Sequence, residues 1–325
     1  MLSILLVTFP FFALVLCGYL AARRRMLPLE AIPGLNTFVL FFALPCMLYR
    51  FGASTPLAQL LDASLFFVYL LCALLMLAWT VLSTRNRHRG GPVGWNDAAF
   101  GALVAAFPNT GFMGVPLLVA LLGTAAAGPA IVTITVDLVI TSSLCIALSR
   151  LDGADKHGAG QALRNAFKGM VANPMPWSIL LGGAASAASF SLPAPVQKTV
   201  SLLADAASPV ALFTIGAVLA RSQMLPSRHA LSVRGWGDVP RIALYKLVLH
   251  PLLVWGVGRL AMAAGWPLDP FALTVVVLVA ALPSASNVSM LAERFDADTG
   301  RVARIILIST AAAFVSFSAA VALLT

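Results

Sequence analysis

The stretch Ala-Phe-Pro-Asn-Thr-Gly-Phe-Met-Gly-Val-Pro, residues 106–116, places two prolines and an asparagine inside a long apolar segment. A second interruption, Ala-Leu-Pro-Ser-Ala-Ser-Asn, residues 281–287, lies in an apolar segment of the second half. Proline removes a backbone donor and clashes with the preceding helical turn, and asparagine adds an amide that needs partners. Lipid supplies none, so each interruption must be buried in protein or line a wet cavity.

The composition indicates an all-α polytopic membrane protein. The 325 residues are 60% hydrophobic and 10% charged, whereas about a quarter of the residues of a soluble domain are charged. At about 20 residues per span, the apolar segments accommodate about ten helices. We expect spans near residues 2–22, 32–50, 64–83, 97–122, 129–149, 171–190, 196–220, 239–263, 270–293 and 302–324.

The distribution of basic residues predicts the orientation. Most of the 21 Lys and Arg residues fall in loops that face one side of this layout, including Arg301 in the loop before the last span. Cytoplasmic loops are rich in Lys and Arg. We therefore predict a multi-pass protein of the inner (cytoplasmic) membrane with both termini outside, in the periplasm. The charge of +9 belongs to these loops, so we expect no nucleic-acid partner.

The chain divides into two similar halves. Residues 1–149 hold five predicted spans, residues 150–169 form a polar connecting loop, and residues 170–325 hold five more. Five is odd, so the second half must be inverted relative to the first. The interruptions fall in spans four and nine. Paired interruptions at matching places in two inverted repeats are the best sequence pointer to the binding site of a transporter.

The polar and flexible residues of the two interruptions are the candidate substrate-binding set. The set comprises Pro108, Asn109, Thr110, Gly111, Pro283, Ser284, Ser286 and Asn287. A simple proline kink is the alternative for the first interruption, and helix packing through small residues is the alternative for the second. If the two cross, half-helix N-termini direct partial positive charge at the centre, where an anion could bind.

These residues carry a family resemblance. Residues 108–117 and 282–287, with Leu-Asn-Thr-Phe-Val at 35–39 and Pro45, resemble the auxin efflux carrier family, which includes bacterial permeases and the plant PIN carriers. The resemblance implies ten helices in two inverted five-helix repeats, with helices four and nine crossing at their prolines and the two asparagines near the substrate. It also implies elevator-like transport of organic anions such as auxin, malonate or malate, and a homodimer. The long cytoplasmic loop of PIN carriers is absent.

Three ionisable residues inside the predicted spans are candidates for ion coupling: Asp137, Lys246 and His250. An ionised Asp in a span needs a partner, a cation or a proton, although Asp137 could instead be a hydrogen-bonded packing residue. Lys246 and His250 share a helix face. Lys246 could extend to the cytoplasmic surface, or it could contact substrate or form an ion pair, and His250 could relay protons or pack.

No nucleotide-binding loop, hydrolase motif or metal-ligand spacing occurs, and the four cysteines lie apart in apolar segments. We therefore expect no enzyme, metal or cofactor. The leading hypothesis is a secondary active transporter of small mono- or dicarboxylates by alternating access, with the lipid bilayer and a small organic anion as partners. The alternative is a sodium-coupled symporter of the bile-acid symporter type. No Glu or Gln flanks either interruption, which favours proton coupling or uniport over sodium.

Overall fold

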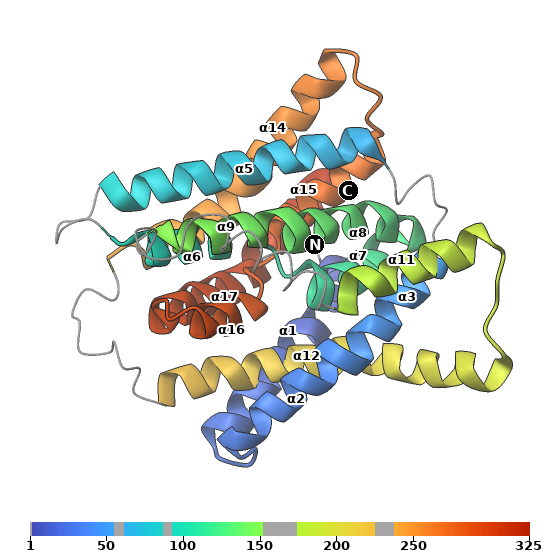
Figure 1. The fold of residues 1–325 in the computed structure, drawn as a ribbon, viewed down its shortest axis with the longest axis horizontal. Coiled ribbons are helices and arrows are strands. Elements are labelled where there is room, and N and C mark those ends of the chain that lie inside the picture. Colours follow the sequence, from blue (N-terminus) through green and yellow to red (C-terminus); the bar gives the residue numbers. More distant parts are fainter. Residues whose placement is uncertain (1, 55–61, 87–92, 152–173, 225–236) are drawn as a thin grey trace. The chain divides into compact units, whose positions relative to one another are not determined.

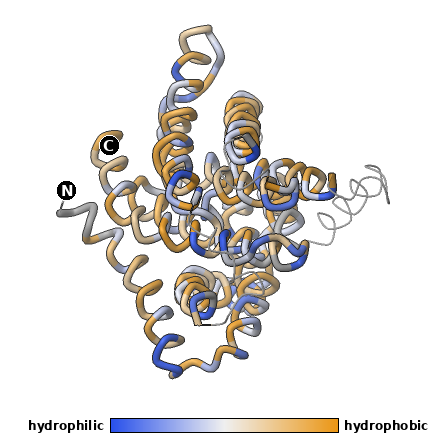
Figure 2. The backbone as a smooth tube through the Cα atoms, turned by 90° about the vertical axis from the view of Figure 1, so that its left-hand side faces the viewer, coloured by the Kyte–Doolittle hydropathy of each residue, from blue (hydrophilic) through white to orange (hydrophobic). Residues whose placement is uncertain are grey.

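The computed structural model describes residues 2–54, 62–86, 93–151, 174–224 and 237–325. Within these ranges the regular structure is helical, apart from one isolated antiparallel bridge between Pro108 and Ser284. Hydrophobic residues run along most of the helices (Figure 2). The all-helical class predicted from composition is confirmed. Most of the predicted connecting loop, 150–169, lies outside the described residues.

Six described helices are long and apolar enough to cross a membrane. They are Leu29–Ser54, Ala63–Arg85, Thr124–Ser149, Ala194–Arg221, Val239–Ala263 and Thr299–Leu324. Four apolar helical segments are shorter: Thr8–Arg23, Thr110–Leu122, Trp177–Ala187 and Pro270–Ala281. Two of the short segments flank the interruptions, since a broken span contributes two half-helices. Helix length therefore supports a multi-pass membrane protein, while the number of ten spans stays a prediction.

The chain forms two compact units, and each unit takes segments from both predicted halves. Unit 1 comprises Met1–Ala63, Thr110–Val132 and Asn173–Leu225, and unit 2 comprises Ser64–Asn109, Thr133–Ala172 and Pro226–Thr325. The unit boundary between Asn109 and Thr110 falls at the first interruption.

Unit 1 is built on the long helix α12. Its helices are α1 (Leu2–Arg23), α2 (Ile32–Phe38), α3 (Leu44–Ser54), α7 (Val115–Leu122), α11 (Pro174–Ala187) and α12 (Ala194–Met224). Helix α12 packs against α1 and α3, and α11 packs against α3 (Figure 1). Gly18 and Gly216 allow the close approach of α1 and α12, because a side chain at either would overlap a carbonyl of the facing helix. Small residues commonly let membrane helices approach in this way.

Unit 2 contains the helices that lead into both interruptions. Its helices are α5 (Ala63–Asn86), α6 (Trp95–Ala106), α9 (Ser142–Ser149), α13 (Val239–Leu244), α14 (His250–Ala263), α15 (Pro270–Ala281), α16 (Asn287–Arg294) and α17 (Thr299–Leu324). Helix α8 (Ala127–Val136) begins in unit 1 and ends in unit 2. Helix α6 packs against α9 and α17, while α15 packs against α14 and α17.

The core of unit 2 lies along α6 and α15. Every residue from Ala98 to Asn109 is buried, and so is every residue from Val275 to Ala285. A helix that is apolar on all sides is stable only inside a bundle, and both of these helices are rich in Ala and Val. The two interruptions are therefore reached from helices that form the interior of unit 2.

Candidate functional site

The two interruptions bind each other through their backbones. Pro108 and Ser284 form an antiparallel bridge. The Asn109 backbone N–H donates to the Pro283 carbonyl at 2.8 Å, and the Ala285 N–H donates to the Phe107 carbonyl at 2.9 Å. Extended backbone inside a membrane is tolerated only where its polar groups find protein partners. Here each interruption supplies the partners that the other needs.

Two carbonyls orphaned by the helix breaks are satisfied by side chains. In an unbroken helix the Val104 carbonyl would accept from residue 108, but Pro108 has no N–H. The Ser284 hydroxyl donates to this carbonyl instead, at 2.7 Å. The Ala280 carbonyl likewise loses the N–H of residue 284, and Lys246 Nζ donates to it at 2.6 Å. The Ser284 N–H donates to Ser309 Oγ at 3.2 Å.

Beside this paired backbone lie the amide side chains of Asn109 and Asn287. Asn109 is 4% exposed, and its side chain makes no hydrogen bond with the residues that the structure describes. Asn287 is the first residue of α16, and its Oδ1 is buried without a partner in the described chain. Ser286, one residue earlier, is partly buried. Buried polar groups are normally hydrogen-bonded, so Asn109 and Asn287 are suited to binding a polar ligand.

Thr110 and Gly111 fall in unit 1. They begin a π-helical turn, Thr110–Gly114, that continues into α7. The turn is supported within unit 1 by Ser208, whose hydroxyl donates to the Phe112 carbonyl at 3.4 Å. That Thr110 and Gly111 contribute to the same binding site as Pro108, Asn109 and the second interruption stays a prediction.

Asp137 is fully buried in unit 2 and belongs to a hydrogen-bonded cluster. It begins a π-helical turn, Asp137–Thr141, an irregularity that is frequent at functional sites. Its Oδ2 accepts from the Tyr69 hydroxyl at 2.9 Å, and its Oδ1 accepts from Thr141 Oγ1 at 3.3 Å. Ser142 Oγ donates to the Asp137 carbonyl at 2.8 Å. The carboxyl group therefore has neutral hydroxyl donors on both oxygens.

Lys246 and His250 lie in the same buried region. Both side chains are 0% exposed, and Lys246 Nζ is 3.2 Å from His250 Nδ1. Asp137 is close enough to Lys246 for electrostatic attraction, and the Tyr69 and His250 rings lie 6.0 Å apart. His250 Nε2 is buried without a partner among the described residues. The alternative that Lys246 extends to the membrane surface is wrong, because its ammonium binds the orphan Ala280 carbonyl.

The cluster brings together all three predicted ion-coupling residues, Lys246 and His250 from one helix and Asp137 from another. Sequence reasoning missed Tyr69, Thr141 and Ser309, since a lone hydroxyl in an apolar helix usually bonds its own backbone. Among the described residues no three His, Cys, Asp or Glu side chains gather where they could hold a metal ion. The region therefore offers one carboxyl, one ammonium, one imidazole and several hydroxyls, which suits proton exchange better than metal binding.

Comparison with known proteins identifies the family. The family described as "Membrane transport protein" matches residues 4–321. The chain belongs to this family. It is 30% identical over 306 residues to a protein named "Putative malonate transporter" from Rhizobium meliloti (strain 1021), covering 93% of this chain and 89% of that protein.

Two other relatives extend the comparison. The "Uncharacterized transporter YfdV" of Escherichia coli (strain K12) is 27% identical, covering 89% of this chain and 88% of that protein. The "Auxin efflux carrier component 8" of Arabidopsis thaliana is 23% identical, covering 85% of each chain. The resemblance to auxin efflux carriers read from the two interruptions is therefore confirmed. The relatives are membrane transporters, which accords with the prediction of a non-enzymatic role.

Proposed function

We propose that this membrane transporter is a secondary carrier of small organic anions, with mono- or dicarboxylates as the substrate class. The observation that carries the proposal is the pair of interlocked interruptions, which holds the nearly buried Asn109 against Pro283 and leaves Asn287 Oδ1 buried without a partner in the described chain. The backbone groups are consumed in holding the interruptions together, so these side chains are available for a ligand. Pro108, Pro283 and Ser284 build this frame, and Ser286 completes the part of the proposed site that lies in unit 2.

An anionic substrate fits the charges of unit 2. Helix α16 begins at Asn287, so its N-terminal partial positive charge lies at the second interruption. Lys246 adds a buried amino group that donates to the carbonyl of Ala280, three residues before Pro283. A relative carries malonate in its printed name, which makes a three-carbon dicarboxylate the first compound to test.

The proposed architecture has ten spans as two inverted repeats, residues 1–149 and 170–325, joined by a cytoplasmic loop at 150–169. Helices four and nine are the interrupted ones, and transport follows elevator-like alternating access. The composition of the two units supports this, because each takes segments from both repeats. We further propose an inner-membrane location with periplasmic termini, and assembly as a homodimer.

We propose protons as the coupling ion. Asp137, with Tyr69 and Thr141 as donors to its two oxygens, is the proposed proton acceptor. Lys246 attracts the Asp137 carboxylate electrostatically. His250 lies beside Lys246, and its Nε2 has no partner among the described residues. A sodium-coupled symporter of the bile-acid symporter type is the alternative. A sodium site needs several oxygen ligands, and the carboxyl group of Asp137 already accepts two hydroxyl hydrogen bonds.

The test is uptake of labelled malonate, malate and auxin by proteoliposomes containing the full chain. We expect uptake of at least one carboxylate, driven by a pH gradient and unchanged when choline replaces sodium. In Asn109→Ala and Asn287→Ala, uptake should fall on the order of 10–100-fold, as expected for losing a hydrogen bond to a charged group.

Gln197→Ala is the matched control, because it removes an exposed amide in the first turn of α12. Its uptake should equal that of the wild type. Full activity in the Asn109→Ala, Asn287→Ala double variant would disprove the proposed site. Uptake that requires sodium would favour the symporter alternative, and uptake of none of the three compounds would reject the substrate class.

A further inference from the structure

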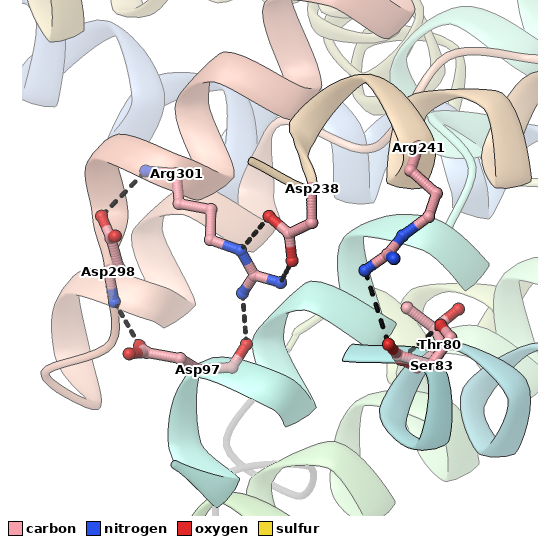
Figure 3. Close-up of polar contacts among 7 residues, drawn as sticks. All are labelled: Thr80, Ser83, Asp97, Asp238, Arg241, Asp298 and Arg301. Carbon is pink, nitrogen blue, oxygen red and sulfur yellow. Dashed lines mark hydrogen bonds and ion pairs between the residues drawn. The ribbon is translucent and has the colours of Figure 1, made fainter. Parts of the chain in front are cut away.

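One arginine joins the beginnings of three helices in unit 2. Arg301 is the third residue of α17, and its side chain is only 9% exposed. Its Nε and Nη2 donate to the two carboxylate oxygens of Asp238 at 3.0 and 2.6 Å, and its Nη1 donates to the Asp97 carbonyl at 2.6 Å (Figure 3). Asp238 is the residue before α13, and Asp97 lies in the first turn of α6.

The surrounding carboxylates offset the unfavourable charge of an arginine at the start of a helix. Helix N-termini carry partial positive charge, which disfavours an arginine. Asp298 caps α17 by accepting from the Arg301 backbone N–H at 2.8 Å, and Asp97 Oδ1 accepts from the Asp298 N–H at 2.8 Å. Asp238 forms the two-pronged ion pair. Such planar pairing fixes orientation as well as distance, so the three helix starts are held in one geometry.

A glycine of α6 makes room for the guanidinium. A Cβ added at Gly101 would lie 2.6 Å from Arg301 Nη2 and 2.9 Å from Nη1. Glycine is otherwise unfavourable inside a helix. The sequence of α6 therefore accommodates Arg301 at a position where alanine would make the better helix.

Farther along, the three helices that Arg301 joins all contact the second interruption or the residue just before it, Ala280. On α6, Val104 accepts from the Ser284 hydroxyl. In the helix that starts with α13, Lys246 donates to the Ala280 carbonyl. On α17, Ser309 accepts from the Ser284 N–H. Each contact lies seven or eight residues beyond the residue that joins the Arg301 cluster, which is about 10–12 Å of helix.

We propose that Arg301 is a positioning residue for the paired interruptions. By fixing the starts of α6, α13 and α17, it sets the positions along these helices of the three groups that bind Ala280 and Ser284. These groups are the Val104 carbonyl, Lys246 Nζ and Ser309 Oγ. It thereby keeps the bridge between Pro108 and Ser284 in register. The proposal concerns the geometry of the interruptions, so it holds whatever the chain transports.

Amide hydrogen exchange on the full chain in detergent tests this without any substrate. In Arg301→Gln, the amides of Asn109 and Ala285, which form the bridge, should exchange about tenfold faster or more, as local opening becomes easier. Gly101→Ala displaces the guanidinium while keeping its charge and should give the same change. Arg301→Lys keeps a cation without the two-pronged geometry and should lie between wild type and Arg301→Gln.

Arg294→Gln is the control, since Arg294 is exposed in the last turn of α16 and makes no hydrogen bond or ion pair with the residues that the structure describes. Its exchange should match the wild type. Amides in α1 and α12 of unit 1 should stay unchanged in every variant. Faster exchange confined to residues 97–101, 238–242 and 298–302 would overturn the proposal, as would equal acceleration throughout both units. Unchanged Asn109 and Ala285 in Gly101→Ala would overturn it too.

Discussion

Replacing Ser284 with alanine measures how much one hydrogen bond, from its hydroxyl to the Val104 carbonyl, contributes to stability. The Ser284 hydroxyl is the donor that replaces the missing N–H of Pro108 at the Val104 carbonyl. Ser284 is 1% exposed and Val104 is fully buried, so no water can take over. Leaving a buried acceptor unsatisfied costs about 1–3 kcal/mol. We expect the free energy of unfolding to fall by that amount.

Ser318→Ala provides a matched comparison within the same unit. Ser318 is also buried, at 2% exposure, and its hydroxyl donates to the Phe314 carbonyl at 2.7 Å. That carbonyl lies four residues earlier in the continuous helix α17, so it also accepts a helical N–H bond. Removing a redundant bond of this kind should change the free energy of unfolding by less than about 0.5 kcal/mol.

Equilibrium unfolding in mixed micelles, followed by circular dichroism over a titration with sodium dodecyl sulfate, measures both variants. The difference should appear as a shifted midpoint with an unchanged slope. If Ser284→Ala and Ser318→Ala are equally stable, the Val104 carbonyl does not depend on Ser284, and the account of mutual capping is refuted.

Two further changes test the proton site and the packing of unit 1. Asp137→Asn should abolish the stimulation of malonate uptake by a pH gradient. The protein should stay folded, because the side-chain amide oxygen still accepts from Tyr69. An unchanged pH profile of uptake would remove Asp137 from coupling. Gly18→Leu should lower the free energy of unfolding by about 1–3 kcal/mol, because the new side chain would overlap the Phe213 carbonyl. A variant as stable as the wild type would contradict the close contact of α1 and α12.

The amino-acid sequence predicts the helical class and the places where helices break, and its resemblance to auxin efflux carriers indicates the family. The class and the breaks follow from local chemistry: long apolar segments, prolines without N–H groups and glycines are visible residue by residue. The span near 97–122 and that near 270–293 were correctly expected to be interrupted at Pro108 and Pro283, where the structure ends α6 and α15.

What sequence reasoning missed depends on partners far apart in the chain. The sequence predicts that Arg301 is a loop charge, because nothing near it in the sequence shows that Asp238, 63 residues away, forms its ion pair. Lys246 lay near a predicted span end, which suggested surface exposure. Only the fold shows that α15 presents an orphan carbonyl to it. Long-range pairing of this kind is fixed by packing, and local patterns carry little signal for it.

The dependence of each interruption on the other has a consequence for biosynthesis. Val104 and Ser284 are separated by 180 residues, and ribosomes add about 5–20 residues per second. For roughly 10–35 seconds after its synthesis, the Val104 carbonyl therefore lacks its hydrogen-bond donor, the Ser284 hydroxyl. During that interval the newly made segment needs shelter from lipid, as the insertion machinery or a provisional partner would provide. The chain reaches its final hydrogen bonding only when its last spans emerge from the ribosome.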